Sequence, residues 1–532
     1  MRPIDSSGGA SALHRGRAAA LLFGGSLVAI VALAAFLRLW QIETQPGGLN
    51  PDEASEAWDA WKILHVPGFH PLFFDDDGGR ESLFAYILAG VFRVFGASAT
   101  TLRGTSAVLG ILGVAVTPLA LRHFGRPVQL VGTAWAAGAL WLICIDRDGF
   151  RNVLVPLVGT LALAALLAWL DRPGRVTAVI AGAVCGLGLW TYQPLKLIPL
   201  WVALWLLIIR WRDRERWARL RGSVIAGVIT YALVAAPIAY VAVTDPTGYF
   251  NRSVVTSAGN PTYGYSELPI HWLRTLLMFG ITGDPNGRHN VADTPLLPPL
   301  VALIAILGAV RCWRNRREPG HLLVLLGLPV FLLPGLLAAE GDAPHFLRAL
   351  GLAPILAALV GLGALEAVAL GKRLLGDGRG RVAGVMVVAV ALVAMTVQSG
   401  VLYFRRDATD RYQPYSVDIV ALADAAREPG AVVLIDHYSA PVVQFLDRDL
   451  SPTVIDEPTV GRVHLAPGTT VVARFSSDIG AALGADAERL AKVVARDPDG
   501  NAVTFRVQVG SSWGGRIPRP SVPGKADRNP GG

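Results

Sequence analysis

The chain is a series of long apolar runs separated by short polar segments, and this pattern continues from residue 18 to about residue 405. Each run of about 20 apolar residues is long enough to cross a bilayer as a helix. The first run, 18–40, follows the basic residues His14, Arg15 and Arg17 and exceeds the apolar core of a signal peptide. We therefore predict an all-α polytopic membrane protein with about 11–13 spans and a cytoplasmic N-terminus.

Composition supports this prediction, because 52% of the 532 residues are hydrophobic and only 17% are charged. The formal net charge of +8 comes mostly from short loops between apolar runs, such as 210–221, 311–317 and 371–381. Loops rich in Lys and Arg mark the cytoplasmic side of a membrane. We therefore interpret the charge as a topology signal and expect no nucleic-acid partner. The three cysteines lie in or beside apolar runs, so neither a disulfide framework nor a cysteine metal site is expected.

Alternation from the basic loops places the unusual polar segments together on the outer face. These segments are 41–82, 146–152, 191–196, 244–295, 340–348 and everything after about residue 403. Between two of these outer ends lie three apolar runs, at about 83–95, 104–121 and 128–145. Two ends on one side demand an even number of crossings, so we expect one of the three runs to bend, re-enter or lie in the interface.

After the last apolar run the pattern becomes that of a soluble domain. Strands are predicted at 431–435, 469–475 and 502–509, and helices at 417–427 and 479–495. The expected organisation is a cytoplasmic N-terminus (1–17), a transmembrane domain (18–405) with its first outer loop at 41–82, a small extracytoplasmic α/β domain (406–513) and a disordered tail (514–532). His437 and Tyr438 follow a predicted strand, where a packed strand end is the simplest interpretation.

The first outer loop opens with clustered acids, in the sequence GGLNPDEASEAWDAWKIL at 47–64. Asn50 suits a helix N-cap and Pro51 the first helical position, while Asp52 and Glu53 complement the helix dipole and Glu53 can close a capping box. An apolar face follows at helical spacing, which is typical of a helix in the membrane interface: Ala54, Ala57, Trp58, Trp61 and Leu64. Capping and catalysis both remain open for these acids.

The end of this loop has a second acidic group, DDDGGRE at 75–81. Asp75 to Asp77 are consistent with a solvated turn. Arg80 and Glu81 stand at the beginning of an apolar run, where an ion pair or a ligand contact is favoured, because unpaired charges at membrane depth are costly.

Further cations lie at other outer ends. Arg147 and Arg151 in DRDGFR are four residues apart, so on a helix they can clamp one phosphate, or they can form a network with Asp146 and Asp148. Tyr192 and Lys196 have the same spacing, although a lone lysine at a helix end is also common. His345 and Arg348 lie in another outer segment, and GDPNGRHN at 283–290 has turn chemistry that is compatible with a purely structural loop.

Together these residues form an outer site with acids on one side and cations on the other. A carboxylate can orient or deprotonate a hydroxyl acceptor, while Arg, Lys and Tyr neutralise a departing phosphate. No P-loop, dinucleotide-binding or hydrolase motif is found in the sequence, so no site for soluble-nucleotide chemistry on the cytoplasmic side is expected. Because there is no nucleotide pool outside the cell, the phosphate donor at an outer site is expected to be attached to a lipid.

The pattern LNPDEASEAWDAWKIL, followed by GGRESLFAYI, resembles the membrane glycosyltransferases of the GT-C fold. Within that fold it is most similar to the protein O-mannosyltransferases and the lipid A aminoarabinose transferase, families 39 and 83. The resemblance covers about 18–405 and is supported by DRDGFRNVLVP, GLGLWTYQPLKLIPL and EGDAPHFLRALG. It implies inverting transfer of a sugar from a polyprenyl-phosphate donor to a protein, lipid or glycan acceptor, at the outer face of the plasma membrane.

The resemblance also implies residue roles. Asp52 matches the family's essential acid, the base or acceptor-orienting group, with Glu53 as its catalytic partner. Positions expected near the donor phosphate are Arg80, Arg147, Arg151, Tyr192, Lys196 and Arg348, with Glu81 and His345 as further site residues. Relatives often have Arg where this chain has Lys196, which cannot form bidentate hydrogen bonds. Some relatives hold a divalent metal, for which Asp52, Asp146 and Asp148 are the candidate ligands here. The alternatives are a transporter or flippase for a lipid-linked sugar and a lipid-phosphate hydrolase.

Overall fold

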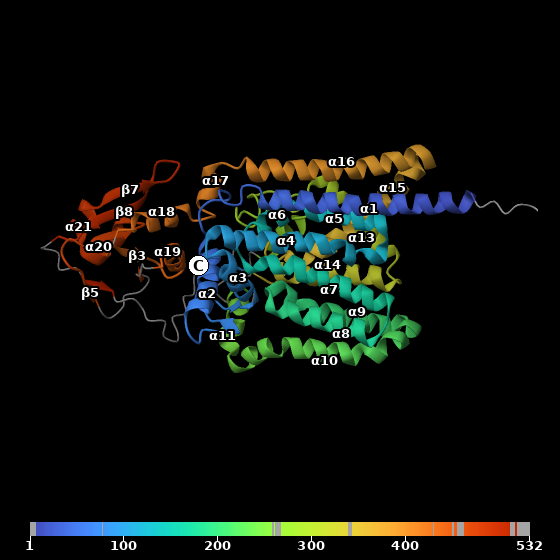
Figure 1. Cartoon of the computed structure of the whole chain (residues 1–532), viewed down its shortest axis with the longest axis horizontal. Coiled ribbons are helices and arrows are strands. Elements are labelled where there is room, and N and C mark those ends of the chain that lie inside the picture. Colours follow the sequence, from blue (N-terminus) through green and yellow to red (C-terminus); the bar gives the residue numbers. More distant parts are fainter. Residues whose placement is uncertain are drawn as a thin grey trace, which may run out of the picture.

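The computed structural model consists of a long helical bundle with a small α/β domain at one end (Figure 1). It describes residues 7–76, 78–257, 260, 268–338, 343–428, 430–448, 452–454, 462–510 and 516–518. The predicted disordered tail therefore lies outside the described residues except at 516–518, and Asp77 of the acidic turn is also outside them.

Long apolar helices form the bundle. In chain order they are α1 (Ser7–Leu39), α4 (Ala99–Ala120), α5 (Arg126–Gly138), α6 (Leu140–Asp146), α7 (Leu154–Asp171), α8 (Arg175–Leu187), α9 (Ile198–Arg212), α10 (Arg214–Thr244), α13 (Pro299–Arg314), α14 (Pro319–Leu336), α15 (Ala353–Leu375) and α16 (Asp377–Phe404). Short 3₁₀ turns continue some of them: η1 (Arg122–Phe124), η2 (Arg151–Val153), η3 (Gly188–Trp190), η4 (Gln193–Leu197) and η6 (Leu350–Leu352).

Among the described residues, eight helices are long and apolar enough to cross a membrane, or nine if α5 and α6 form one bent span. The chain is therefore an integral membrane protein. This number is lower than the 11–13 spans expected, because α8 with η3 and α13 are shorter than the others. Both still pack lengthwise in the bundle, α8 against α10 and α13 against α15. Counting these two with the nine gives eleven segments.

The three apolar runs between residues 81 and 145 behave differently from one another. The first is α3 (Leu83–Phe95), which has only 13 residues and packs beside α2 (Pro51–His65) at the end of the bundle (Figure 1). The second is α4, a full-length helix, and the third is the pair α5 and α6, bent by 59°. The expectation that one of the three runs is irregular is therefore met by the bent pair, and the first run is also too short to count as a span.

The predicted cytoplasmic loops meet at one end of the bundle. His123, between α4 and α5, lies 2.6 Å from Asp171 after α7 and 3.2 Å from Glu318 before α14. At the opposite end lie α2, α3, α11 (Pro246–Val255) and the C-terminal domain (Figure 1). The grouping of loops by alternation is thus reproduced, while the side of the membrane that each end faces stays a prediction.

The C-terminal domain contains a five-stranded mixed sheet in the order β4-β3-β6-β8-β7. Its strands are β3 (Val432–Ile435), β4 (Thr453–Val454), β6 (Thr470–Ala473), β7 (Lys492–Arg496) and β8 (Ala502–Gln508), and β5 (Arg462–His464) pairs separately with β9 (Arg516–Pro518). Strands β4 and β6 run parallel to β3, whereas β8 is antiparallel to β6 and β7. The domain's helices are α17 (Ala408–Tyr412), α18 (Val417–Ala425), α19 (Ala440–Leu446), α20 (Ser476–Leu483) and α21 (Ala485–Leu490).

The three predicted strands of this domain are confirmed, but the single helix expected over 479–495 is wrong. Gly484 has a φ of 102°, a left-handed conformation that breaks the segment into α20 and α21. The remaining residues, 492–496, include two adjacent valines and pair with β8 as an edge strand. Their β-branched side chains favour a strand over a third helical turn.

The domain and the first outer loop share one hydrophobic core. Phe445 of α19 stacks on Phe92 of α3 with 6.0 Å between ring centroids, and α19 packs directly on α2. Buried apolar residues from both sides form this core, including Leu49, Ala54, Ala57, Phe84, Leu422, Val443 and Val472. The domain is therefore packed against the polar loop that contains the candidate acids.

Candidate active site

The capping box predicted for the first outer loop is confirmed. Asn50 Oδ1 accepts a hydrogen bond from Asp52 N at 2.9 Å, and Asn50 N donates to Glu53 Oε2 at 3.1 Å. The helix that follows, α2, is more buried than an interfacial helix, however. Ala54 and Ala57 face the shared core, and the acids on the other faces, Asp52, Glu53, Glu56 and Asp59, are buried as well. Each of these acids therefore needs a partner within the protein.

Asp52 is paired with a cation from a distant loop. Arg288 Nη2 lies 2.5 Å from Asp52 Oδ2, and the same guanidinium donates to Asn50 Oδ1. The hydroxyl of Tyr438, from the C-terminal domain, donates to Asp52 Oδ1 at 3.2 Å. Burial opposes ionisation, but Arg288, followed by Arg252, lowers the pKa of Asp52 below its ordinary value. Asp52 is therefore an ionised carboxylate at neutral pH.

Glu53 is fully engaged in structural contacts. Arg103 of α4 forms a bidentate pair with it, from Nε to Oε1 and from Nη2 to Oε2, both at 2.8 Å. Gly149 N also donates to Oε1 at 2.9 Å. Together with the capping bond, these contacts occupy both oxygens, so the geometry gives Glu53 a positioning role and leaves no free position for a substrate.

Glu56 and Asp59 continue this pattern along α2. Arg151 Nη1 donates to Glu56 Oε1 at 2.8 Å, whereas Glu56 Oε2 is buried without a hydrogen bond among the described residues. Burial raises the pKa of Glu56 to about 6 against the opposing effect of Arg151. Asp59 binds Arg80 at 2.5 Å, and Arg80 also binds the partly exposed Asp76 at 2.7 Å. Arg80 thus joins α2 to the acidic turn.

Arg151, Tyr192 and Lys196 are brought together, as the sequence suggested. Glu81 lies between the two cations, with Oε1 3.0 Å from Lys196 Nζ and Oε2 3.4 Å from Arg151 Nε. The Arg151 guanidinium lies over the Tyr192 ring, and Lys196 over the ring of Tyr249, which precedes Arg252 on α11. Arg151 Nε and Nη2 are buried and make no hydrogen bond within the described parts of the chain.

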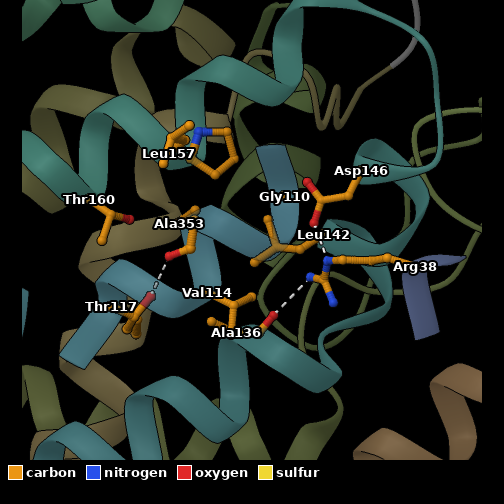
Figure 2. A pocket seen from close by; sticks show the side chains of 13 residues that line it. Arg38, Gly110, Val114, Thr117, Ala136, Leu142, Asp146, Leu157, Thr160 and Ala353 are labelled. Atoms are coloured by element: carbon orange, nitrogen blue, oxygen red, sulfur yellow. Dashed lines mark hydrogen bonds and ion pairs between the residues drawn. The ribbon is translucent and has the colours of Figure 1, made fainter. Parts of the chain in front are cut away.

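Arg147 and Asp146 do not join this cluster. Residues 147–150 are not helical, so Arg147 and Arg151 do not share a helix face. Arg147 Nη1 instead donates to the carbonyl of Arg38 at 2.8 Å, and its guanidinium stacks on Tyr403. Asp146 is held by Arg38 Nε at 2.6 Å, beside Gly110, where an added Cβ would collide with the carboxylate (Figure 2). The prediction that Arg147 and Arg151 share a helix face is therefore wrong.

Asp148 lies close to Asp52, but Arg288 stands between them. Arg288 Nε is 3.7 Å from Asp148 Oδ2, and neither oxygen of Asp148 has a hydrogen bond among the described residues. Burial, followed by the nearby Glu53 carboxylate, raises the pKa of Asp148 well above its ordinary value. Asp52, Asp146 and Asp148 do not form a metal-ligand group in the described structure, because Asp146 turns to Arg38.

His345 and Arg348 lie beside the same site. Burial, followed by the charge of Arg348, lowers the pKa of His345 well below its ordinary value. The ring of His345 is 4.7 Å from that of His289, which follows Arg288 in the chain and binds Asp284 at 2.9 Å. The described residues contain one group of metal-ligand type, formed by Asp284, His289 and His345.

Sequence reasoning missed several residues of the site. Arg288 and His289 belong to the polar loop 283–290, which turn chemistry alone seemed to explain, although its Arg and His on the outer side were a usable signal. Arg103 is the only charged residue near the start of α4. Tyr438 had been interpreted as a packed strand end, but it reaches Asp52 from another domain, and no local pattern encodes that contact.

The structure is similar over most of its length to other solved structures. ArnT from Cupriavidus metallidurans bound to undecaprenyl phosphate aligns with a TM-score of 0.59 at 15% identity, covering 93% of this chain and 98% of that one. AglB, an oligosaccharyltransferase from Archaeoglobus fulgidus in complex with an inhibitory peptide and a dolichol-phosphate, aligns with a TM-score of 0.53 at 13% identity, covering 87% and 70%. No family model and no curated protein sequence matches the chain.

These similarities establish the fold. The chain has the GT-C-like architecture of those proteins, a helical membrane bundle followed by a C-terminal domain with a mixed sheet, as the sequence resemblance implied. At identities of 13–15% they do not transfer an activity, which has to be argued from the site.

Two neighbouring acids should respond differently to loss of charge. Glu53→Gln breaks the bidentate pair with Arg103 and leaves that arginine buried and unpaired, so the protein should lose about 3–5 kcal/mol of stability. Asp52→Asn leaves Arg288 its contact with Asn50 and should lose clearly less. Thermal unfolding of the detergent-solubilised variants measures this difference, and equal loss in both would contradict the positioning role of Glu53.

Asp148→Asn should become more stable than the parent protein as the pH rises. Because its pKa is raised, Asp148 retains its proton to a higher pH in the folded parent than in the unfolded chain, which releases the proton above the ordinary carboxyl pKa. Each pH unit between these two pKa values therefore costs the parent about 1.4 kcal/mol, a cost that Asn avoids. Unfolding measured at pH 4.5 and pH 7.5 tests this, and a difference that does not grow with pH would show that Asp148 is ionised in the folded protein.

Proposed function

We propose that this protein is an inverting membrane glycosyltransferase that uses a polyprenyl-phosphate-linked sugar as donor. The observation that carries the proposal is Asp52, an ionised carboxylate at the end of a GT-C-like bundle with arginines from two other segments nearby. A displacement at a phosphate-bearing carbon requires an acid that orients the acceptor and cations that bind the phosphate. Arg151 of η2 supplies such a cation, because it contacts Glu56 of α2 and has guanidinium nitrogens without a hydrogen bond among the described residues.

The acceptor is bound at Asp52 in this proposal. A hydroxyl or similar group of the acceptor donates its hydrogen bond to the carboxylate and attacks the anomeric carbon from the face opposite the phosphate. The new bond to the acceptor oxygen forms as the bond to the phosphate oxygen breaks, which inverts the anomeric centre. The low pKa of Asp52 makes it a weak base, so it acts mainly by orienting the nucleophile and accepts the proton as the new bond forms.

The donor phosphate is bound by Arg151 and Lys196. Two guanidinium nitrogens of Arg151, Nε and Nη2, are buried without a hydrogen bond in the described structure. An arriving phosphate would satisfy them and share the two cations with Glu81. Arg348 and Arg252, whose charges act on His345, extend the positive region towards Asp52. Arg147 and Arg80 are occupied by carbonyls and carboxylates and serve structural roles in this scheme.

The ArnT structure contains undecaprenyl phosphate and the AglB structure a dolichol-phosphate, which supports the same donor class for this chain. The proposed location is the plasma membrane, with the N-terminus cytoplasmic and α2 and the C-terminal domain outside, where lipid-linked donors replace nucleotide sugars. The acceptor is a protein, lipid or glycan of the envelope. A hydrolase would use similar groups but would release free sugar.

Asp52→Asn should abolish sugar transfer while leaving donor binding intact, because the asparagine side chain has the same size and shape as aspartate but its amide cannot accept a proton. Membranes that contain the variant should accumulate the lipid-linked sugar, as measured by mass spectrometry, with transfer reduced by about 100-fold or more. Asp75→Asn, an exposed acid of the same loop, is the matched control. Near-normal transfer by Asp52→Asn would refute the central role of Asp52, and free sugar as the main product of the parent protein would favour a hydrolase.

Tyr438→Phe should slow transfer by about 3- to 10-fold without unfolding the protein, since it removes one hydrogen bond from a partly exposed side chain. Loss of a donor to the carboxylate raises the pKa of Asp52, so the acid limb of the pH–rate profile should move to higher pH. Tyr240→Phe, an exposed tyrosine on α10, is the control. An unchanged rate and profile would mean that the contact is incidental.

A further inference from the structure

Two histidines and an aspartate from two separate segments converge beside the candidate active site. Asp284 and His289 lie in the loop between α12 (Leu268–Leu277) and α13, and His345 lies just before η6. Each offers one ligand atom, and these three atoms lie within 4.8 Å of one another. Asp284 and His289 are buried, and His345 is half-buried.

The surrounding backbone holds the carboxylate of Asp284 in place. Its Oδ1 accepts a hydrogen bond from Asn286 N at 2.8 Å, and its Oδ2 accepts one from Phe346 N at 2.6 Å. The second bond ties the segment with His345 to the loop with His289. An antiparallel bridge between Gly283 and Pro295 closes the base of that loop. The carboxylate of Asp284 is thus positioned by backbone contacts that are independent of any ligand.

A hydrogen-bonded Asp–His pair explains only part of this arrangement. His289 Nδ1 and Asp284 Oδ2 are 2.9 Å apart, which satisfies both groups. His345 Nδ1, however, is buried and has no hydrogen bond among the described residues. Its ring nevertheless lies 4.7 Å from that of His289, centroid to centroid. A buried imidazole nitrogen without a hydrogen bond is costly, and next to an Asp–His pair it is available to a ligand that needs several donor atoms.

We propose that Asp284, His289 and His345 bind a divalent transition-metal ion, with zinc as the first choice. Two imidazoles and one carboxylate are a common protein ligand set for such ions, whereas Mg²⁺ and Ca²⁺ prefer oxygen ligands. Ligand atoms on a tetrahedral zinc are roughly 3.3 Å apart, so small side-chain movements would bring the three ligand atoms from their present separation to that distance. A fourth position remains for water.

The cations nearby limit the affinity without excluding the ion. Arg288 is neutralised by Asp52, so its charge is already compensated before a metal binds. Arg348 and Arg252 face the same region and act on His345. A bound dication is therefore expected to be exchangeable, in contrast to the closed four-ligand structural sites of zinc proteins.

Metal binding would fix the position of Arg288. This residue immediately precedes His289, and its side chain pairs with Asp52 and Asn50. An ion that binds both His289 and His345 would therefore also restrict the movement of Arg288, the cation that is paired with Asp52. This consequence rests on the proposed function, whereas the binding of the ion does not, so the two are tested separately.

The test measures metal on the full-length protein, purified in detergent and stripped with a chelator. The unmodified protein is titrated with Co²⁺ and followed by visible absorption, and Zn²⁺ is then added to displace it. Zinc content at a fixed free Zn²⁺ concentration is measured for the parent protein, His289→Asn and His345→Asn. His70→Asn, which alters an exposed histidine of the first outer loop, is the matched control.

The parent protein and His70→Asn should hold about one zinc per chain, and each of the other two variants at least about tenfold less. Co²⁺ should give ligand-field bands that Zn²⁺ abolishes. Equal zinc in all four proteins, or no displaceable Co²⁺ spectrum in the parent, would overturn the proposal. The Co²⁺ titration uses only the parent protein, so it tests metal binding even if a variant fails to fold. Because no sugar transfer is measured, failure to bind metal would not contradict the proposed function. Likewise, failure to transfer sugar would not contradict metal binding.

Discussion

The free-energy cost of burying carboxylates on α2 is the constraint on which the rest of this structure depends. An unpaired carboxylate costs several kcal/mol in a protein interior, so each buried acid requires a cation with good geometry. Asp52 is paired with Arg288, Glu53 with Arg103, Glu56 with Arg151 and Asp59 with Arg80. These four arginines come from four different segments. The short helix α2 therefore fixes the relative positions of much of this end of the bundle.

The four acid–arginine pairs are not equivalent, and their differences distinguish the acids with a structural role from the candidate catalytic acid. Glu53 is saturated by a bidentate arginine and two backbone amides, and Asp59 is shared between Arg80 and Lys62. Asp52 has one strong partner and a tyrosine hydroxyl from a partly exposed residue. Burial raises the pKa of its neighbour Asp148 and so opposes ionisation of that carboxyl group. Asp52 is therefore the carboxylate of this group that is charged and has contacts that an incoming acceptor can replace.

The C-terminal domain is part of this arrangement. Its apolar residues complete the core above α2, and Arg448 donates to the carbonyl of Ala97 at 2.9 Å. Asn50, which begins α2, donates in turn to the carbonyl of Pro414. Any movement of the domain would therefore disturb both the cap of α2 and the contact of Tyr438 with Asp52. The domain and the acidic loop form one structural unit.

Local patterns were sufficient for much of the fold and for part of the site. Apolar runs and basic loops predicted the helical bundle and the grouping of its loops. Both signals are local, because the length of an apolar run needed to cross the bilayer and the preference of Lys and Arg for cytoplasmic loops apply to each segment separately. Capping chemistry predicted the start of α2, since its donors and acceptors are three residues apart. The irregularity between residues 81 and 145 followed from counting crossings, because three apolar runs cannot all span the membrane between two ends on the same side.

Pairing between segments was decided only by the tertiary structure. Nothing within DRDGFR separates Arg147, which binds the end of α1, from Arg151, which binds α2, because the difference lies in how the chain turns between them. Arg288 and Tyr438 are 236 and 386 residues from Asp52 along the chain. Local sequence determines where a charge can be tolerated, but the identity of its partner depends on which distant segments the packed helices bring into contact.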